Sequence, residues 1–167
     1  KVVRRSAELG HMTHARSLAD RMAELADTTR YPFEVFGHIH TALSLYFAGS
    51  DPTQVSARLD IAESLFPADP SKLVAVGLIG GPMQWEQSGL AREARWKIAS
   101  VGAYVGDIDR AIRMLDGLDE PVTAWLGLVA ENLPVSSLSV LMAFAEETLP
   151  PHDYAYVAVQ FARFAAA

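Results

Sequence analysis

Four of the five histidines in this sequence are spaced in a way that could hold a metal ion. His11 and His14 are three residues apart, so they share one face of a helix, and His38 and His40 lie on the next predicted helix. Imidazole nitrogens are common zinc ligands. However, no carboxylate lies at a matching spacing, and residues two apart on a helix point about 200° apart. We therefore expect these histidines to lie on the surface or in a groove, and we expect no metal site.

Two tryptophans and an arginine are the best candidates for a binding site. Trp85 and Trp96 are eleven residues apart, which is about three helical turns, and Arg92 falls between them on nearly the same side. Tryptophan and arginine are over-represented among the residues that dominate binding energy. A stripe at helical spacing is also typical of a buried core face, and Gly89 can interrupt a helix here. Core packing and a ligand-binding or partner-binding groove are therefore both open for these residues.

Catalytic chemistry has little support in the sequence. The segment 77–82, GLIGGP, is rich in glycine like a phosphate-binding loop, but it lacks the Gly-Lys-Ser/Thr ending, and a helix break explains it better. There is no cysteine to act as a nucleophile, and the carboxylates are spread as on a solvated helical surface. We expect no enzyme activity and no cofactor, and we assign no residue to a catalytic role.

The composition narrows the class of partner. The 14 Lys and Arg residues against 20 Asp and Glu residues give a net charge of −6, and the basic residues are scattered, so direct nucleic-acid binding is not expected. The longest apolar stretch, 73–83, is about half the roughly 20 residues that a membrane span needs. The absence of cysteine agrees with a reducing compartment. We therefore expect a cytoplasmic protein that does not enter a membrane.

The elements that would position any site are predicted to be helices. Apolar residues recur at spacings of three, four and seven, and no sustained alternation indicates a half-buried strand. The sequence therefore predicts an all-α fold of about ten helices. The clearest stripes are Ala15, Leu18, Ala19, Met22 and Ala26; Phe36, Ile39, Leu43 and Phe47; Val55, Leu59, Ala62 and Phe66; Ala94, Ile98, Val101 and Val105; and Tyr154, Val157, Phe161 and Phe164.

The junctions between these helices indicate a repeat. Gly10, Gly49 and Gly106 lie where left-handed helix ends are expected, and Asp51 precedes a proline in the pattern of an N-cap. An alanine that opens an apolar stripe follows the first and third glycines by five residues. The second repeat starts at Gly49, 39 residues after Gly10, and its apolar positions are shifted by one or two residues. The period is near the 34 residues of tetratricopeptide repeats, and it predicts antiparallel helix pairs stacked as an α-solenoid.

Two segments resemble a known kind of helical repeat. Residues 15–52 read AxxLAxxMAELAxxxxYPFxxxGHIHTALSLYFAGSDP, and residues 104–115 read YVGDIDRAIRML. Together they cover 50 of the 167 residues. They resemble the tetratricopeptide-like regions that follow the ATPase core of LuxR-type transcriptional regulators, and those attached to some bacterial adenylate cyclases. The resemblance implies a regulatory helical array whose surface receives an inducer or a partner domain, and it supplies no catalytic residue.

The sequence leads to one main functional hypothesis and two alternatives. We expect residues 1–167 to be a single repeat segment of a larger bacterial regulatory protein, because the chain starts without Met and stops within a helical pattern. Its partner would be a protein, another domain of the same chain, or a small-molecule effector. Uncovered end faces would allow homo-oligomers. A compact helical domain that binds a small molecule, with Trp85 and Trp96 as its walls, is the second hypothesis, and an enzyme is the third.

Overall fold

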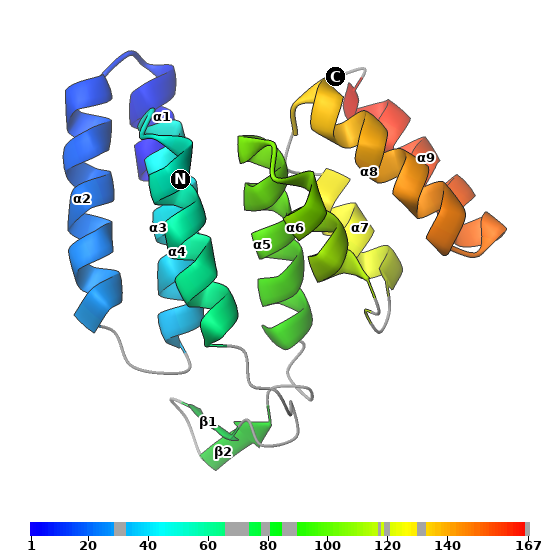
Figure 1. Ribbon diagram of the computed structural model, residues 1–167, viewed down its shortest axis with the longest axis horizontal. Helices are drawn as coiled ribbons and strands as arrows, with labels where there is room; N and C mark the ends of the chain where they lie inside the picture. The colour runs from blue at the N-terminus through cyan, green and yellow to red at the C-terminus, as the bar shows by residue number, and fades with distance from the viewer. Residues whose placement is uncertain are drawn as a thin grey trace. The chain divides into compact units, whose positions relative to one another are not determined.

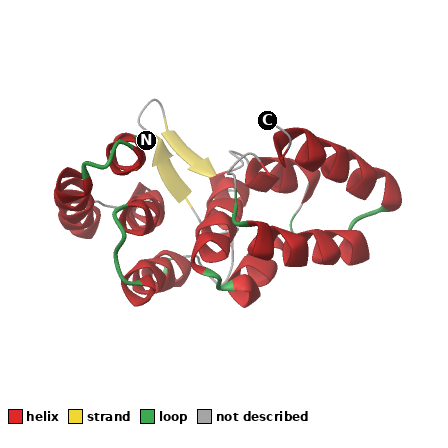
Figure 2. Cartoon of the chain, turned by 90° about the horizontal axis from the view of Figure 1, so that it is seen from above, coloured by secondary structure: helices red, strands yellow, loops and turns green. Residues whose placement is uncertain are grey.

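A computed structural model describes most of the chain, in eight stretches. In these stretches the chain forms nine helices and one two-stranded sheet (Figures 1 and 2). It divides into two compact units, Lys1–Ala94 and Arg95–Ala167, and each unit is described here by itself. The predicted all-α class is confirmed apart from the small sheet, while a single repeat segment stays a prediction. The residues described are 1–28, 33–65, 74–77, 81–84, 90–116, 118, 121–129 and 133–165.

Four consecutive helices form most of the first unit. Each packs on the next, and α1 also contacts α3, so α3 contacts three helices. Figure 2 shows these four helices nearly end on, near the N-terminus. Asp51 begins the last of them as predicted, because its carboxylate accepts the Thr53 amide at 2.8 Å and Pro52 occupies the first helical position. The helices are α1 (Val2–Glu8), α2 (Met12–Thr28), α3 (Phe33–Phe47) and α4 (Pro52–Ser64).

The core of this unit follows the predicted stripe on α4, follows it in part on α2 and departs from it on α3. On α2 the three alanines of the stripe are 0 to 3% exposed, whereas Leu18 and Met22 are half-buried. On α4, Val55, Leu59 and Ala62 are fully buried, and Phe66 lies outside the described residues. On α3, Ile39 is buried, whereas the other three predicted positions are only half-buried. This part of the prediction was wrong because α3 packs against three helices, so its buried residues do not follow one stripe. The buried α3 residues are Val35, His38, Ile39, Thr41, Ala42, Ser44, Leu45 and Ala48, just past its end.

Gly77, Gly81 and Pro82, from the glycine-rich segment, lie in the two strands of a short β-hairpin and not in a helix, and residues 78–80 lie outside the described residues. Strand β1 (Val74–Gly77) pairs antiparallel with β2 (Gly81–Gln84), and Gly77 lies opposite Gly81. A strand of four residues places only two side chains on each face, which is too few to establish an alternating pattern. The hairpin follows α4 in the chain and precedes α5 (Figure 1).

The second unit consists of most of α5, from Arg95 on, and of α6 to α9. Helix α6 contacts α8, while α9 contacts both α7 and α8. Its largest fully buried side chain is Trp125, and Leu128, Leu141 and Val157 are each 0% exposed. The buried hydroxyl of Ser137 donates to the Ala103 carbonyl at 2.7 Å, which ties α8 to α5. The helices are α5 (Leu90–Val105), α6 (Ile108–Leu115), α7 (Pro121–Val129), α8 (Val135–Thr148) and α9 (Pro151–Ala165).

Three helix ends share one backbone conformation. Gly10, Gly49 and Gly106 have φ values of 80°, 69° and 81°, the left-handed region that glycine adopts without steric cost. At each, the glycine amide donates to the carbonyl three residues earlier and the next amide donates to the carbonyl five residues earlier, at 2.9 to 3.3 Å. This is the Schellman motif. The prediction of left-handed ends at these three glycines is confirmed.

The residue that begins the next buried face follows each glycine closely. Helices α2 and α6 start two residues after Gly10 and Gly106, and α4 starts three residues after Gly49. Ala15 and Ala111 therefore come five residues after their glycines, and Val55 comes six after its own. All three are 0% exposed. The buried position in the repeat that starts at Gly49 is therefore shifted by one residue, because the junction before α4 is one residue longer.

None of the described helices is both long and apolar enough to span a bilayer. The longest, α2, has 17 residues, which is about 26 Å at 1.5 Å per residue. A hydrocarbon core of about 30 Å requires roughly 20 residues of mainly apolar character.

Candidate functional site

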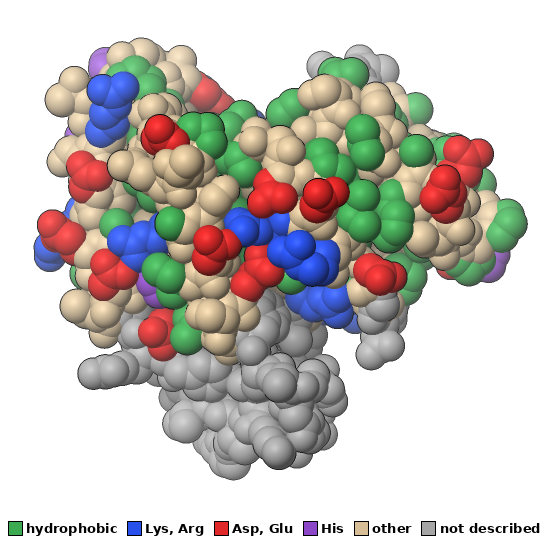
Figure 3. Space-filling model, in the orientation of Figure 1, with side chains coloured by type: hydrophobic (Ala, Val, Ile, Leu, Met, Phe, Trp, Pro, Cys, Tyr) green, Lys and Arg blue, Asp and Glu red, His purple; other side chains and the backbone are tan. Residues whose placement is uncertain are grey.

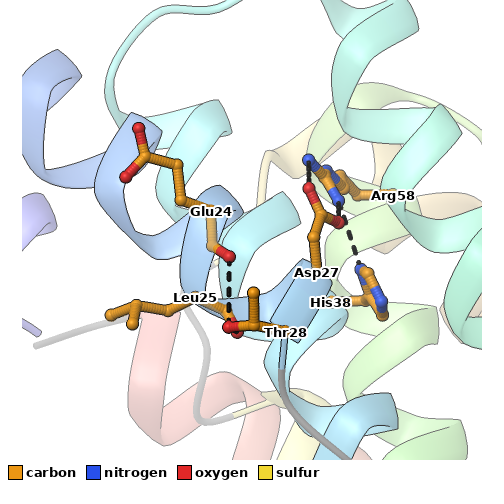
Figure 4. Close-up of polar contacts among 6 residues, drawn as sticks. All are labelled: Glu24, Leu25, Asp27, Thr28, His38 and Arg58. Carbon is orange, nitrogen blue, oxygen red and sulfur yellow. Dashed lines mark hydrogen bonds and ion pairs between the residues drawn. The ribbon is translucent and has the colours of Figure 1, made fainter.

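The most developed polar site joins three helices through Asp27, His38 and Arg58, which we call the polar cluster (Figure 4). Asp27 lies in the last turn of α2, His38 in the second turn of α3 and Arg58 in the middle of α4. The guanidinium of Arg58 donates to both carboxylate oxygens of Asp27, with Nη2 to Oδ2 at 3.1 Å and a shorter bond from Nη1 to Oδ1. The same Nη1 lies 3.4 Å from His38 Nδ1. One arginine therefore links the carboxylate and the imidazole.

Burial and charge set the protonation states in the polar cluster. The Arg58 hydrogen bond lowers the pKa of Asp27, so this carboxylate is ionised at neutral pH. Burial lowers the pKa of His38, which is 3% exposed, and the positive charge of Arg58 lowers it further. Since a guanidinium can only donate, Nδ1 of the neutral ring carries the lone pair and accepts from Arg58. The cluster therefore holds a charged pair beside a neutral buried imidazole.

The geometry of the polar cluster is that of a link between helices. The carboxylate of Asp27 binds Arg58 and does not orient the imidazole, as a carboxylate in a catalytic triad does. Within the described residues, the side chain that lies at hydrogen-bond distance from His38 is that of Arg58. The arrangement can transmit a change of charge between three helices, but it does not assemble a nucleophile and a base.

The histidines considered for metal binding are dispersed. His11, His14 and His40 are exposed, whereas His38 is buried in the polar cluster, so His38 and His40 point to different sides of α3 as expected. Within the described stretches, no group of three His, Asp or Glu side chains is arranged to hold a metal ion.

The structure places Trp96 and Arg92 on α5, and Trp85 lies outside the described residues, between β2 and α5. Trp96 is half-buried and its ring covers Gly127 on α7: a Cβ atom added to Gly127 would lie 3.1 Å from two atoms of the indole. The ammonium of Lys97 lies 4.4 Å from the centre of the Trp96 ring. Trp96 therefore packs helices together, which favours the core interpretation for this residue. Arg92 is half-buried in the first turn of α5.

A shallow open hollow of about 490 Å³ lies along α2. Its charged side chains are largely engaged: Arg16 Nε donates to the Ala48 carbonyl at 3.3 Å, and Arg21 pairs with Glu24 at 2.5 Å. Figure 3 shows acidic and basic side chains close to one another over α2, at the left of the view. The hollow has no charge preference that would select a ligand. Its described lining consists of Thr13, Arg16, Ser17, Asp20, Arg21 and Glu24.

One buried hydroxyl near the polar cluster has no hydrogen-bond partner within the described stretches. Thr41 lies one turn after His38 on α3 and is 0% exposed. An unsatisfied buried polar group costs about 1–3 kcal/mol. We expect Thr41→Val, which keeps the shape, to raise the free energy of unfolding in urea by about 1 kcal/mol. As a control, Thr123→Val at an exposed position on α7 should change the free energy of unfolding by no more than about 0.5 kcal/mol. A loss of stability in Thr41→Val would show that the hydroxyl is satisfied in the folded protein.

Asp27 and Arg58 were missed by reasoning from the sequence. They are 31 residues apart, and neither belongs to an apolar stripe. A charged residue on a predicted helix is usually solvated, so type and position alone gave no reason to single them out. The one available signal was His38, which lies three residues after Val35 and four residues before Ala42, both of them apolar.

Comparison with models of protein families, with curated proteins and with solved structures finds no match for this chain.

Proposed function

We propose that the chain is a non-catalytic helical-repeat segment of a bacterial regulatory protein, which binds a protein partner or another domain of its own polypeptide. The observation that carries this proposal is the repeated junction. Three helices end in the same Schellman conformation, and each is followed by a fully buried small or β-branched residue five or six positions later. Repetition of one backbone unit is the basis of solenoid architecture.

The packing within each unit supports an α-solenoid of antiparallel helix pairs. In such an array a helix contacts its successor and also the equivalent helix of the next pair. Helix α1 contacts α2 and α3 in the first unit, and α6 contacts α8 and α7 contacts α9 in the second. An array of this kind offers a long surface for a partner and can bend when it binds.

Solution scattering tests the architecture. We expect a radius of gyration clearly above the value of about 15 Å that a compact domain of this length would have. A compact profile would favour the alternative, a helical domain that encloses a small molecule.

A cross-linking experiment tests the function. A photo-reactive amino acid in place of Trp85 or Arg92, our proposed contacts with a partner, should give one defined adduct in the bacterial cell. The adduct would be with a protein or with another part of the same polypeptide. The control carries the reactive residue at exposed Asp109 on α6 and should give no such adduct. Equal labelling at all three positions, or at none, would contradict the proposed contacts.

A further inference from the structure

The polar cluster has one contact that depends on the protonation state of His38. In the neutral ring, Nδ1 accepts a hydrogen bond from Arg58 across 3.4 Å. A proton added to Nδ1 replaces the lone pair with an N–H group, so two donors and two positive charges would face each other at this distance. The contact would change from attractive to repulsive.

The surroundings of His38 leave few ways to relieve this repulsion. The ring is 3% exposed, and the side chain of Arg58 is 19% exposed. Among the described residues, the charged groups that act on His38 are Arg58 on α4, Asp27 on α2 and Glu34 on α3. Both carboxylate oxygens of Asp27 already accept from Arg58, so a bond from a protonated ring would have to share this carboxylate with the guanidinium. A movement of Arg58 away from the protonated ring would weaken its pair with Asp27, which links α2 to α4.

We propose that Asp27, His38 and Arg58 form an acid-sensitive latch, which holds α4 against α2 and α3 at neutral pH and releases α4 when His38 takes up a proton. Position supports this role as well as chemistry. Arg58 reaches Asp27 across 31 residues of chain, and this pair directly joins α2 to α4. Each of the three helices supplies one member, so breaking the cluster removes a polar link among all three.

The direction of the pH dependence follows from the lowered pKa of His38, whose ordinary value is 6.5. Above pH 6.5 the ring is neutral in both the folded and the unfolded chain, so the full stability is present. As the pH falls below 6.5, the unfolded chain binds the proton first, and the folded state loses stability down to the pKa of the folded protein. Each unit by which the pKa is lowered corresponds to a tenfold change in the folding equilibrium.

Hydrogen exchange of backbone amides tests the latch. We expect amides of α4 to lose protection between pH 7.5 and 5.5, after correction for intrinsic exchange rates, by up to about tenfold for each unit by which the pKa is lowered. Amides of α6, in the other unit, serve as the internal reference and should keep their protection. His38→Asn retains an acceptor near the position of Nδ1 but cannot be protonated, so its α4 protection should be the same at both pH values.

Two further measurements keep the proposal falsifiable. His14→Asn removes an exposed histidine from α2 and should keep the pH dependence of the unchanged protein. If His38→Asn does not fold, NMR of the unchanged protein can follow the ring nitrogens of His38, which should titrate below pH 6.5 together with the loss of α4 protection. Titration of His38 at or above pH 6.5, or equal loss of protection in α4 and α6, would overturn the latch.

Discussion

Trp125→Ala is expected to lower the free energy of unfolding by about 3–5 kcal/mol, the usual cost of removing a large aromatic side chain from a core. Trp125 is 1% exposed, and its ring centre lies 6.4 Å from that of Phe144 on α8. Its removal would take away both the buried area and the aromatic contact between α7 and α8. Urea unfolding followed by far-ultraviolet circular dichroism measures the loss.

Tyr156→Ala is the control for this prediction. Tyr156 is also a large aromatic residue in the second unit, but it is 51% exposed on α9. We expect its replacement to change stability by no more than about 0.5 kcal/mol. A similar effect at both positions would mean that Trp125 does not pack in the core.

Ala111→Leu is expected to cost about 1–3 kcal/mol, because the first turn of α6 is packed too closely for a larger side chain. Ala111 is 0% exposed. The opposite surface is Gly102 on α5, where an added Cβ atom would lie 3.6 Å from the Ala111 amide nitrogen and 3.1 Å from the Asp107 carbonyl oxygen. Backbone meets backbone at this point, so side-chain rearrangement alone cannot make room.

The same substitution at an exposed alanine separates packing from helix propensity. Ala143 lies on the outer side of α8, so Ala143→Leu should be nearly neutral in the same urea experiment, within about 0.5 kcal/mol. An Ala111→Leu protein as stable as the unchanged chain would mean that the repeat positions have been assigned incorrectly.

Helix ends were the best-predicted part of the fold. A left-handed residue after a helix is a local requirement that glycine meets without steric cost, so Gly10, Gly49 and Gly106 could be assigned from the sequence alone. The faces of α3 could not be assigned in this way. Phe47 was predicted to be buried but is only half-buried, with the Arg4 guanidinium 4.9 Å from its ring centre. The extent of burial there depends on three neighbouring helices, which no local pattern specifies.

The candidate site was harder to predict than the fold. The polar cluster depends on an ion pair between residues 31 positions apart, and helical periodicity carries no information about such a pair. The role of Trp96 depended in the same way on a distant residue, because Gly127 on α7 provides the space that the indole fills. Spacing along the chain singled out Trp96, but it could not distinguish a core contact from a binding contact.

The extra residue after Gly49 has a consequence for how such genes diverge. If the repeat that starts at Gly49 is aligned without a gap on the repeat that starts at Gly10, exposed Gln54 falls on buried Ala15. The residue at the equivalent buried position is Val55. One additional codon at this junction therefore offsets every later position by one, which is about 100° around a helix. The backbone motif absorbs the insertion before α4 begins, so the helix still presents its apolar face to the core. Two repeats can thus keep the same fold while a single in-frame insertion removes most of the residue-by-residue similarity between them.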